Sequence, residues 1–279
     1  MLEVIGVSCG YDNRTVLFDI HFRLERGEMM GIIGPNGSGK TTLLRLMART
    51  ILPAKGTVYW QGRELDVLSA REWARKTAVV SQSPPLCDMP VEAFVLLGRI
   101  PYLGRLQLRE TAQDRQAVRK ALELTGLTDM KERYLSRMSG GERQMALIAR
   151  ALAQEPELLL MDEPTTHLDL SHQIEIMDLV GRLNEEGGLT VVLVLHDLNL
   201  AAEYCRRLLF LNEGRIQVDG PPEEVLTEEI LGRAYPVPLR VERNPFSGKP
   251  HVLIVPRKGS AVLNEGRRFG LRAQGTIGH

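Results

Sequence analysis

The sequence predicts an α/β fold in which a mainly parallel sheet carries an antiparallel β flank and an inserted α-helical subdomain. Alternating apolar and polar residues at the start of the chain predict the antiparallel flank. Apolar strands that alternate with helical stretches after residue 155 predict a parallel sheet covered on both faces. Between these parts, residues 91–154 read almost wholly as helices, which predicts a subdomain inserted into the core.

The first core segment, residues 1–90, begins with two strands on either side of the turn-forming pair Asp12-Asn13. A buried strand then ends in glycine, and a helix follows with Leu43, Leu44 and Met47 on one face. The expected strands are 2–11, 16–24, 28–33, 57–60 and 77–80, and the expected helices begin near Gly39 and cover 69–75.

The inserted subdomain is expected over residues 91–154, and the core is expected to resume over 155–239. Glycine, proline and serine in the loops of the insert separate its helices. The expected helices are 111–125, 142–154, 172–186 and 198–206, and the expected strands of the resumed core are 158–161, 189–195 and 208–211.

Residues 240–279 form a basic C-terminal extension, with eight Lys and Arg against two Asp and Glu. Segments 237–241 and 251–255 flank a connection rich in Pro and Gly and could form a hairpin. Beyond Pro256, glycine and charge dominate, so we expect a flexible tail. A solvated tail is the favoured interpretation, and contact with membrane headgroups or a partner is the alternative.

The bulk composition excludes several classes of protein. The 279 residues contain 35 Lys and Arg and 35 Asp and Glu, so the formal net charge is zero. The chain therefore lacks the excess of positive charge that is typical of nucleic-acid-binding proteins. Cys9, Cys87 and Cys205 lie far apart, which favours a reducing compartment over disulfides or zinc. The N-terminus lacks a signal-peptide pattern, and no apolar run approaches the ~20 residues of a membrane helix.

The strongest motif is a glycine-rich loop between a predicted strand and a predicted helix. Its glycines let backbone N–H groups curl around phosphate oxygens, the helix N-terminus adds its dipole, and Lys40 reaches the β and γ phosphates. The hydroxyl of Thr41 would ligate Mg²⁺. With this context an accidental glycine turn is a minor alternative, and the loop predicts a P-loop NTPase core. The loop comprises Gly34, Pro35, Asn36, Gly37, Ser38, Gly39, Lys40 and Thr41, and Thr42 follows it.

Two further motifs supply acids and a second anion site. The apolar strand 158–161 ends in Asp162 and Glu163. Because side chains alternate along a strand, Asp162 can contact the magnesium shell while Glu163 contacts the attacking water. An exposed acidic strand end is the alternative for that pair alone. At Ser139-Gly140-Gly141-Glu142 a long helix begins, and its N-terminus can bind an anion while Ser139 also caps the helix.

Together these motifs resemble the nucleotide-binding subunit of ABC transporters. That family's signature is Leu-Ser-Gly-Gly-Gln/Glu, and this chain has Met138 at the first position, which conserves apolar volume. The resemblance covers residues 1 to about 235, with the motifs in family order and spacing. In that family two subunits close head to tail, and each ATP lies between the phosphate loop of one and the signature of the other.

The resemblance implies roles for further residues. Tyr11 would stack on adenine, and Gln82 would sense Mg²⁺ and the water while linking to the membrane subunits. Asp169 would act across the dimer, and His196 would hold the γ-phosphate and orient Glu163. Taken singly, Tyr11, Gln82 and His196 could equally be a strand residue, a loop amide and a core histidine. Trp60, Trp73, His172 and the cysteines are assigned to the core or surface, because nothing in the sequence places them near the nucleotide.

Several segments resemble the ATPases of importers for iron–siderophore, haem, cobalamin or molybdate. They are Val95–Gly104, Thr165–Asp169 and Leu195–Ala202. The resemblance implies a homodimer at the cytoplasmic face of the membrane that works with transmembrane permease subunits and, indirectly, a substrate-binding protein.

Two other classes of ABC protein remain as alternatives. One is a soluble ABC ATPase of DNA repair or translation, but such chains usually carry two cassettes, long coiled coils or a zinc hook. The other is an exporter cassette, which is normally fused to its membrane helices.

Overall fold

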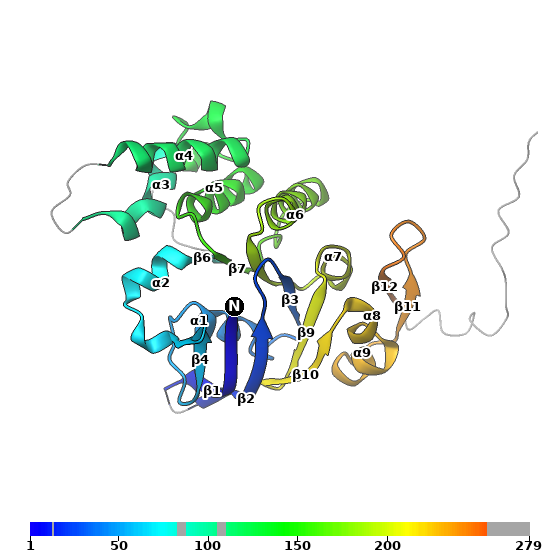
Figure 1. The fold of residues 1–279 in the computed structure, drawn as a ribbon. Coiled ribbons are helices and arrows are strands. Elements are labelled where there is room, and N and C mark those ends of the chain that lie inside the picture. The colour runs from blue at the N-terminus through cyan, green and yellow to red at the C-terminus, as the bar shows by residue number, and fades with distance from the viewer. Residues whose placement is uncertain (13, 83–87, 105–109, 256–279) are drawn as a thin grey trace, which may run out of the picture.

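The computed structural model describes residues 1–12, 14–82, 88–104 and 110–255, and places them in three sheets and their covering helices (Figure 1). The first sheet is antiparallel, in the order β2-β1-β4-β5. Its strands are β1 (Leu2–Tyr11), β2 (Arg14–Leu24), β4 (Lys55–Trp60) and β5 (Arg63–Glu64). Alternate residues of β1 and β2 are buried, as expected for strands with one solvated face.

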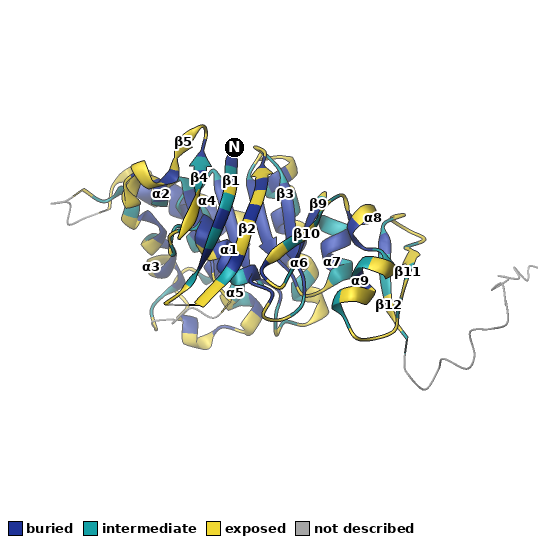
Figure 2. Cartoon of the chain, turned by 90° about the horizontal axis from the view of Figure 1, so that it is seen from below, coloured by how far each residue is buried: buried dark blue, intermediate teal, exposed yellow. Residues whose placement is uncertain are grey.

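The main sheet has the strand order β10-β9-β3-β8-β7-β6. Its strands are β3 (Met29–Ile33), β6 (Thr77–Val80), β7 (Leu158–Asp162), β8 (Thr190–Val194), β9 (Arg207–Asn212) and β10 (Arg215–Gly220). All pairs are parallel except the edge pair β9–β10. Every residue of β3, β7 and β8 is buried, which explains why these strands read as continuous apolar runs. Figure 2 shows β3 in the dark blue of buried residues.

Two hydrophobic clusters hold the layers together. One lies between the two sheets and includes the apolar side of helix α1 (Lys40–Met47) with an edge-on pair of Trp60 and Trp73 at 4.9 Å. The other covers the opposite face of the main sheet with residues of α5 (Gly140–Ala153), α6 (Leu170–Glu185) and α7 (Leu198–Tyr204). These layers confirm the α/β core with an antiparallel flank.

The helical subdomain contains α3 (Val91–Leu96), α4 (Ala112–Leu124) and α5 (Gly140–Ala153), with short 3-10 turns between them. Arg99 is its buried centre, because its guanidinium pairs with Asp114 at 2.9 Å and Glu155 at 2.7 Å and donates to the carbonyl of Ala153. The guanidinium also lies 3.8 Å from the ring centroid of Tyr102. One side chain therefore joins the turn before α4, the start of α4 and the end of α5.

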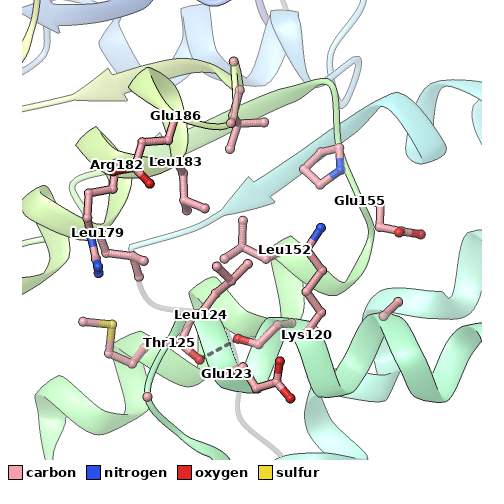
Figure 3. A pocket seen from close by; sticks show the side chains of 18 of the residues that line it. Lys120, Glu123, Leu124, Thr125, Leu152, Glu155, Leu179, Arg182, Leu183 and Glu186 are labelled. Carbon is pink, nitrogen blue, oxygen red and sulfur yellow. Dashed lines mark hydrogen bonds between the residues drawn. The ribbon is translucent and has the colours of Figure 1, made fainter.

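A cleft of about 1010 Å³ separates this subdomain from α6 of the core (Figure 3). Lys120, Leu124 and Leu152 line it from the subdomain, and Leu179 and Arg182 line it from α6. The cleft contains none of the residues of the phosphate loop. The predicted nucleotide site lies elsewhere, at the carboxyl ends of the parallel strands.

Beyond the main sheet, α8 (Pro222–Val225) and α9 (Glu228–Ala234) lead to an antiparallel hairpin of β11 (Leu239–Arg243) and β12 (Pro250–Ile254). The hairpin docks on α7, where Asn199 bonds both backbone groups of Val252, at 2.7 Å from its N–H and 3.3 Å to its carbonyl. Figure 1 shows the hairpin beside α7. The predicted flexible tail after Pro256 lies outside the described residues, as does Cys87.

Most predicted elements are present with ends shifted by one or two residues, and a few observed elements were not predicted. Strands β5 and β10 and helices α8 and α9 were not predicted, and α5 begins at Gly140 rather than at residue 142. The early start follows from the capping box at Ser139, which satisfies the first N–H groups of the helix. No helix within the described ranges is long and apolar enough to span a membrane.

Candidate active site

The predicted site residues of the core gather at the carboxyl ends of four neighbouring parallel strands. The phosphate loop follows β3, Gln82 follows β6, Asp162 and Glu163 end β7, and His196 follows β8. Asp162 pairs in register with Val194 of β8, which in turn pairs with Ile32 of β3. Ligands of open α/β sheets bind at this edge because the loops after the strands converge there.

The phosphate loop has the backbone that the motif predicts. Gly34, Gly37 and Gly39 have φ of 147°, 78° and 105°, in the left-handed region that favours glycine. A Cβ at Gly34 would lie 1.9 Å from the carbonyl oxygen of Leu211, so the loop lies directly against β9. Pro35 accepts a 3.3 Å hydrogen bond from the N–H of Ser38, and Asn36 is exposed at the tip of the loop.

Lys40 is buried inside the loop, where its Nζ donates to the carbonyls of Gly34 and Pro35, both at 2.9 Å. Burial lowers the pKa of the Lys40 amine, while the carboxylates of Glu163 and Asp162 oppose that shift. Among the described residues, the buried hydroxyl of Ser38 at the same place has no hydrogen-bond partner. A buried amine and an unpaired hydroxyl fit an anionic ligand that would supply the missing acceptor.

Oxygen donors suited to Mg²⁺ lie beside the loop. Thr41 Oγ1 donates to Asp162 Oδ1 at 3.2 Å. Burial raises the pKa of Asp162, and the hydrogen bond from Thr41 opposes the shift. Within the described ranges, no group of three or more His, Cys, Asp and Glu could hold a metal by itself. The donor set fits a magnesium ion completed by phosphate oxygens and water, as is usual for this ion.

Glu163 is the centre of a hydrogen-bond network. Its Oε2 accepts from Gln82 Nε2 at 2.6 Å and from Thr166 Oγ1 at 3.3 Å, and its Oε1 bonds His196 Nε2. The backbone of Glu163 has φ of 52°, a conformation uncommon for a residue with a side chain. Strained backbone of this kind concentrates at functional sites, which supports a chemical role for the carboxylate.

Tyr11 lies at the mouth of the loop. Its hydroxyl is 3.5 Å from Thr42 Oγ1 and accepts from Arg45 Nη1 at 3.0 Å. Tyr11 is 38% exposed, as a residue that stacks on a ligand at the surface would be. Arg45 was not predicted as a site residue. Its spacing held a signal, because residues three and four apart lie on the same face of a helix and Arg45 follows Thr42 and Thr41 at that spacing.

The signature residues and Asp169 lie together at a second place. Ser139 caps α5, its N–H donates to Glu142 Oε2 at 2.7 Å, and its Oγ accepts from the N–H of Glu142. A backbone hydrogen bond from Ser139 lowers the pKa of Glu142. Among the described residues, no hydrogen bond or ion pair joins this group to the phosphate loop or to Glu163. The chain therefore presents two separate half-sites.

His172, which the sequence assigns to the core or surface, is partly exposed and lies beside the predicted signature residues. Its ring packs on Gly141 and bonds Asp169, both of which are predicted nucleotide-site residues. The sequence held one signal of the contact with Asp169. His172 follows that N-cap residue by three positions, which places it on the first turn of α6 within reach of the capping side chain.

The fold and the phosphate loop define a P-loop nucleoside triphosphatase. The family model described as "ABC transporter" matches residues 17–166, so the chain belongs to the ABC transporter family. Cassettes of this family bind and hydrolyse ATP to drive transport, and this chain is such an ATPase. In the family they function as dimers with transmembrane permease partners.

Individual relatives match along almost the whole chain. YusV of Bacillus subtilis, named as a probable siderophore transport system ATP-binding protein, is 40% identical over 93% of this chain and 94% of its own length. FepC of Escherichia coli, a ferric enterobactin transport ATP-binding protein, is 38% identical over 92% and 95%. A solved inward-facing transporter described as of metal-chelate type aligns with a TM-score of 0.79 at 28% identity, covering 92% of this chain and 98% of that one. The likeness to the iron–siderophore branch is confirmed.

Proposed function

We propose that the chain energises uptake of ferric siderophores, as the ATP-hydrolysing subunit of an importer. The relatives described above are named for siderophore and ferric enterobactin transport, which supports this cargo over haem or cobalamin. The observation that carries the proposal is the network at Glu163, because it joins a carboxylate, a histidine and an amide beside the buried amine of Lys40.

Hydrolysis follows from the positions of these groups. Lys40 faces the β and γ phosphates from inside the loop, and the Ser38 hydroxyl supplies a further donor. Glu163 orients water in line with the γ-phosphate and accepts its proton, while His196 fixes the carboxylate from the opposite side. Phosphoryl transfer depends mainly on positioning and charge, so the precision of this network sets the rate.

Magnesium would be held by Thr41 Oγ1, Asp162 and the side-chain oxygen of Gln82, and when bound it would neutralise charge on the phosphates. The amide of Gln82 supports both roles, because its Nε2 donates to Glu163 and an amide oxygen is an acceptor that can ligate a metal ion. Tyr11 presents its exposed ring to adenine.

Two copies would complete the reaction centre. The phosphate loop and the signature of one chain form separate half-sites, so the signature of a second copy has to supply Ser139, Gly140 and Gly141 to the nucleotide. The N-terminus of α5 is suited to this, since its N–H groups and dipole favour the γ-phosphate. Asp169 lies in the same half-site and would contact the partner. This arrangement is the head-to-tail homodimer that the resemblance implies.

The cargo itself would never touch this chain. We place the homodimer peripherally at the cytoplasmic face of the membrane, where it would drive permease subunits through the helical subdomain and the segment after Gln82. A substrate-binding protein would deliver the cargo to those subunits. Nucleic acid is not a partner in this proposal, as the balanced charge implies.

Uptake of a radiolabelled ferric siderophore tests the proposal in a strain that lacks this chain. We expect restored uptake with the wild-type protein and background uptake with Glu163→Gln. A panel of siderophores, haem and cobalamin, tested in parallel, identifies the transported compound. Restored uptake of haem or cobalamin but of no siderophore would contradict the proposed cargo. Equal uptake with both proteins would contradict the proposed role of Glu163.

A further inference from the structure

His172, on the first turn of α6, contacts two segments that are far apart in sequence. Its Nδ1 lies 2.9 Å from both carboxylate oxygens of Asp169, and its backbone N–H donates to Asp169 Oδ1 at 3.0 Å. Its ring lies against the backbone of Gly141, because a Cβ built there would be 1.9 Å from the ring carbon Cδ2 and 2.5 Å from Nε2. Only a residue without a side chain permits this contact.

The same two segments are also close one position earlier. A Cβ built at Gly140 would lie 3.7 Å from Leu168 Cδ2, so there is room for a methyl group between them. No hydrogen bond joins Asp169 directly to residues 139–142 in the described part of the chain. His172 therefore contacts both segments, by packing its ring on Gly141 at the start of α5 and by its hydrogen bonds to Asp169 at the start of α6.

Charge in the neighbourhood favours this arrangement. The carboxylate of Asp169 faces the ring directly, and those of Glu175 and Glu142 lie close enough to favour the imidazolium. Glu142 is also paired with Arg133 at 3.2 Å and bonded to Ser139. The imidazole thus adjoins the carboxylate that caps the signature helix.

We propose that His172 is a positioning residue that holds Asp169 and the signature segment Ser139–Glu142 as one unit for presentation to the second copy. This inference rests on the proposed head-to-tail dimer. The two segments belong to different parts of the fold, and a cleft separates those parts elsewhere. By holding the two segments together, His172 would fix the distance between the signature residues, which bind the partner's nucleotide, and Asp169, which contacts the partner's chain.

ATP-driven dimerisation of the Glu163→Gln protein tests the inference, because this variant is expected to retain ATP. The ATP concentration for half-maximal dimer is measured by sedimentation, and binding of a fluorescent ATP analogue to dilute monomer is measured in parallel. We expect His172→Ala to raise the ATP concentration for half-maximal dimer by roughly 3- to 30-fold. Binding of the analogue to the monomer should stay unchanged. His172→Asn, whose amide nitrogen can still donate to Asp169, should recover most of the loss. His21→Ala, on the exposed face of β2, is the matched control and should change neither.

A double substitution tests the ring contact separately. Gly141→Ala forces its methyl group into the imidazole, so it should weaken dimerisation, and adding His172→Ala should restore part of the loss by making room. Additive losses would overturn the contact as the basis of the link. A His172→Ala protein that dimerises like its parent would overturn the proposal itself. If the Glu163→Gln parent fails to dimerise with ATP, the proposed dimer is wrong and the inference falls with it.

Discussion

Gln82 donates a 2.6 Å hydrogen bond to Glu163, so the ends of two neighbouring parallel strands meet at one carboxylate. His196 reaches the other oxygen of that carboxylate from the end of a third strand. The sheet therefore fixes the orientation of Glu163 from two sides, which is how a general base is held ready for its proton.

Replacing Glu163 with glutamine should lower the ATPase rate by ~10²–10⁴-fold, because the amide cannot accept the proton of the attacking water. Nucleotide binding should persist, since Lys40 and the loop are untouched. Steady-state ATPase assays and nucleotide titration measure the two effects. Glu157→Gln, at a carboxylate paired with Lys76 outside this network, is the control and should keep the wild-type rate.

Gly34→Ala should destabilise the protein more than Gly62→Ala. Both glycines have positive φ, but a Cβ at Gly34 meets the carbonyl oxygen of Leu211 at 1.9 Å and a Cβ at Gly62 meets open space. The conformation alone costs an alanine about 1–2 kcal/mol, and crowding at Gly34 should add ~1–3 kcal/mol. Denaturant unfolding measures the difference, and equal values would refute the close approach of the loop to β9.

Arg99→Ala should cost ~3–5 kcal/mol of unfolding free energy, because it leaves the buried carboxylate of Asp114 without its partner. Arg115→Ala removes an exposed pair with Glu110 in the same subdomain and should cost less than ~1 kcal/mol. Chemical denaturation compares them. Similar costs for the two variants would show that Arg99 does not organise the subdomain.

The pKa of His172 should lie above 6.5, because the Asp169 side chain bonds the imidazolium. A raised folded-state pKa means that the stabilisation is fully present below the pKa of the unfolded chain and is lost as pH rises through the folded pKa. The backbone N–H of His172 is the main cause of a lowered pKa at Asp169. The stabilisation that the Asp169 carboxylate contributes is therefore lost only as pH falls through that lowered pKa. An NMR titration of the ring, in wild type and in Asp169→Asn, should show the pKa falling in the variant. An unchanged value would contradict the pairing.

Most of the core could be predicted from the sequence because its signals are local. The apolar runs of β7 and β8, the glycines of the phosphate loop and the cap at Ser139 each determine a conformation from neighbouring residues. Strand β10 and the helices after it were not predicted, although the glycine turn at Gly214 signalled a hairpin with β9.

Residues whose roles arise from tertiary contacts were harder to predict. Arg99 has the charge of a surface residue and yet lies at the centre of the helical subdomain, since its partners come from helices that only the fold brings together. His172 gave no sign of its contact with Gly141, because that contact depends on how α5 and α6 pack. The resemblance to the ABC family supplied the roles of Tyr11, Gln82 and Asp169, which no local pattern carries.

The most direct test of the account is the ATPase rate of two inactive variants measured alone and as an equal mixture. Lys40→Ala removes the phosphate loop's amine, and Ser139→Arg blocks the signature. In a mixed head-to-tail pair, the intact loop of one chain meets the intact signature of the other. The account predicts that mixing restores about a quarter of the wild-type rate, because half of randomly formed pairs carry one complete site. No recovery on mixing, or a Ser139→Arg protein that is fully active as a monomer, would contradict the requirement for two copies.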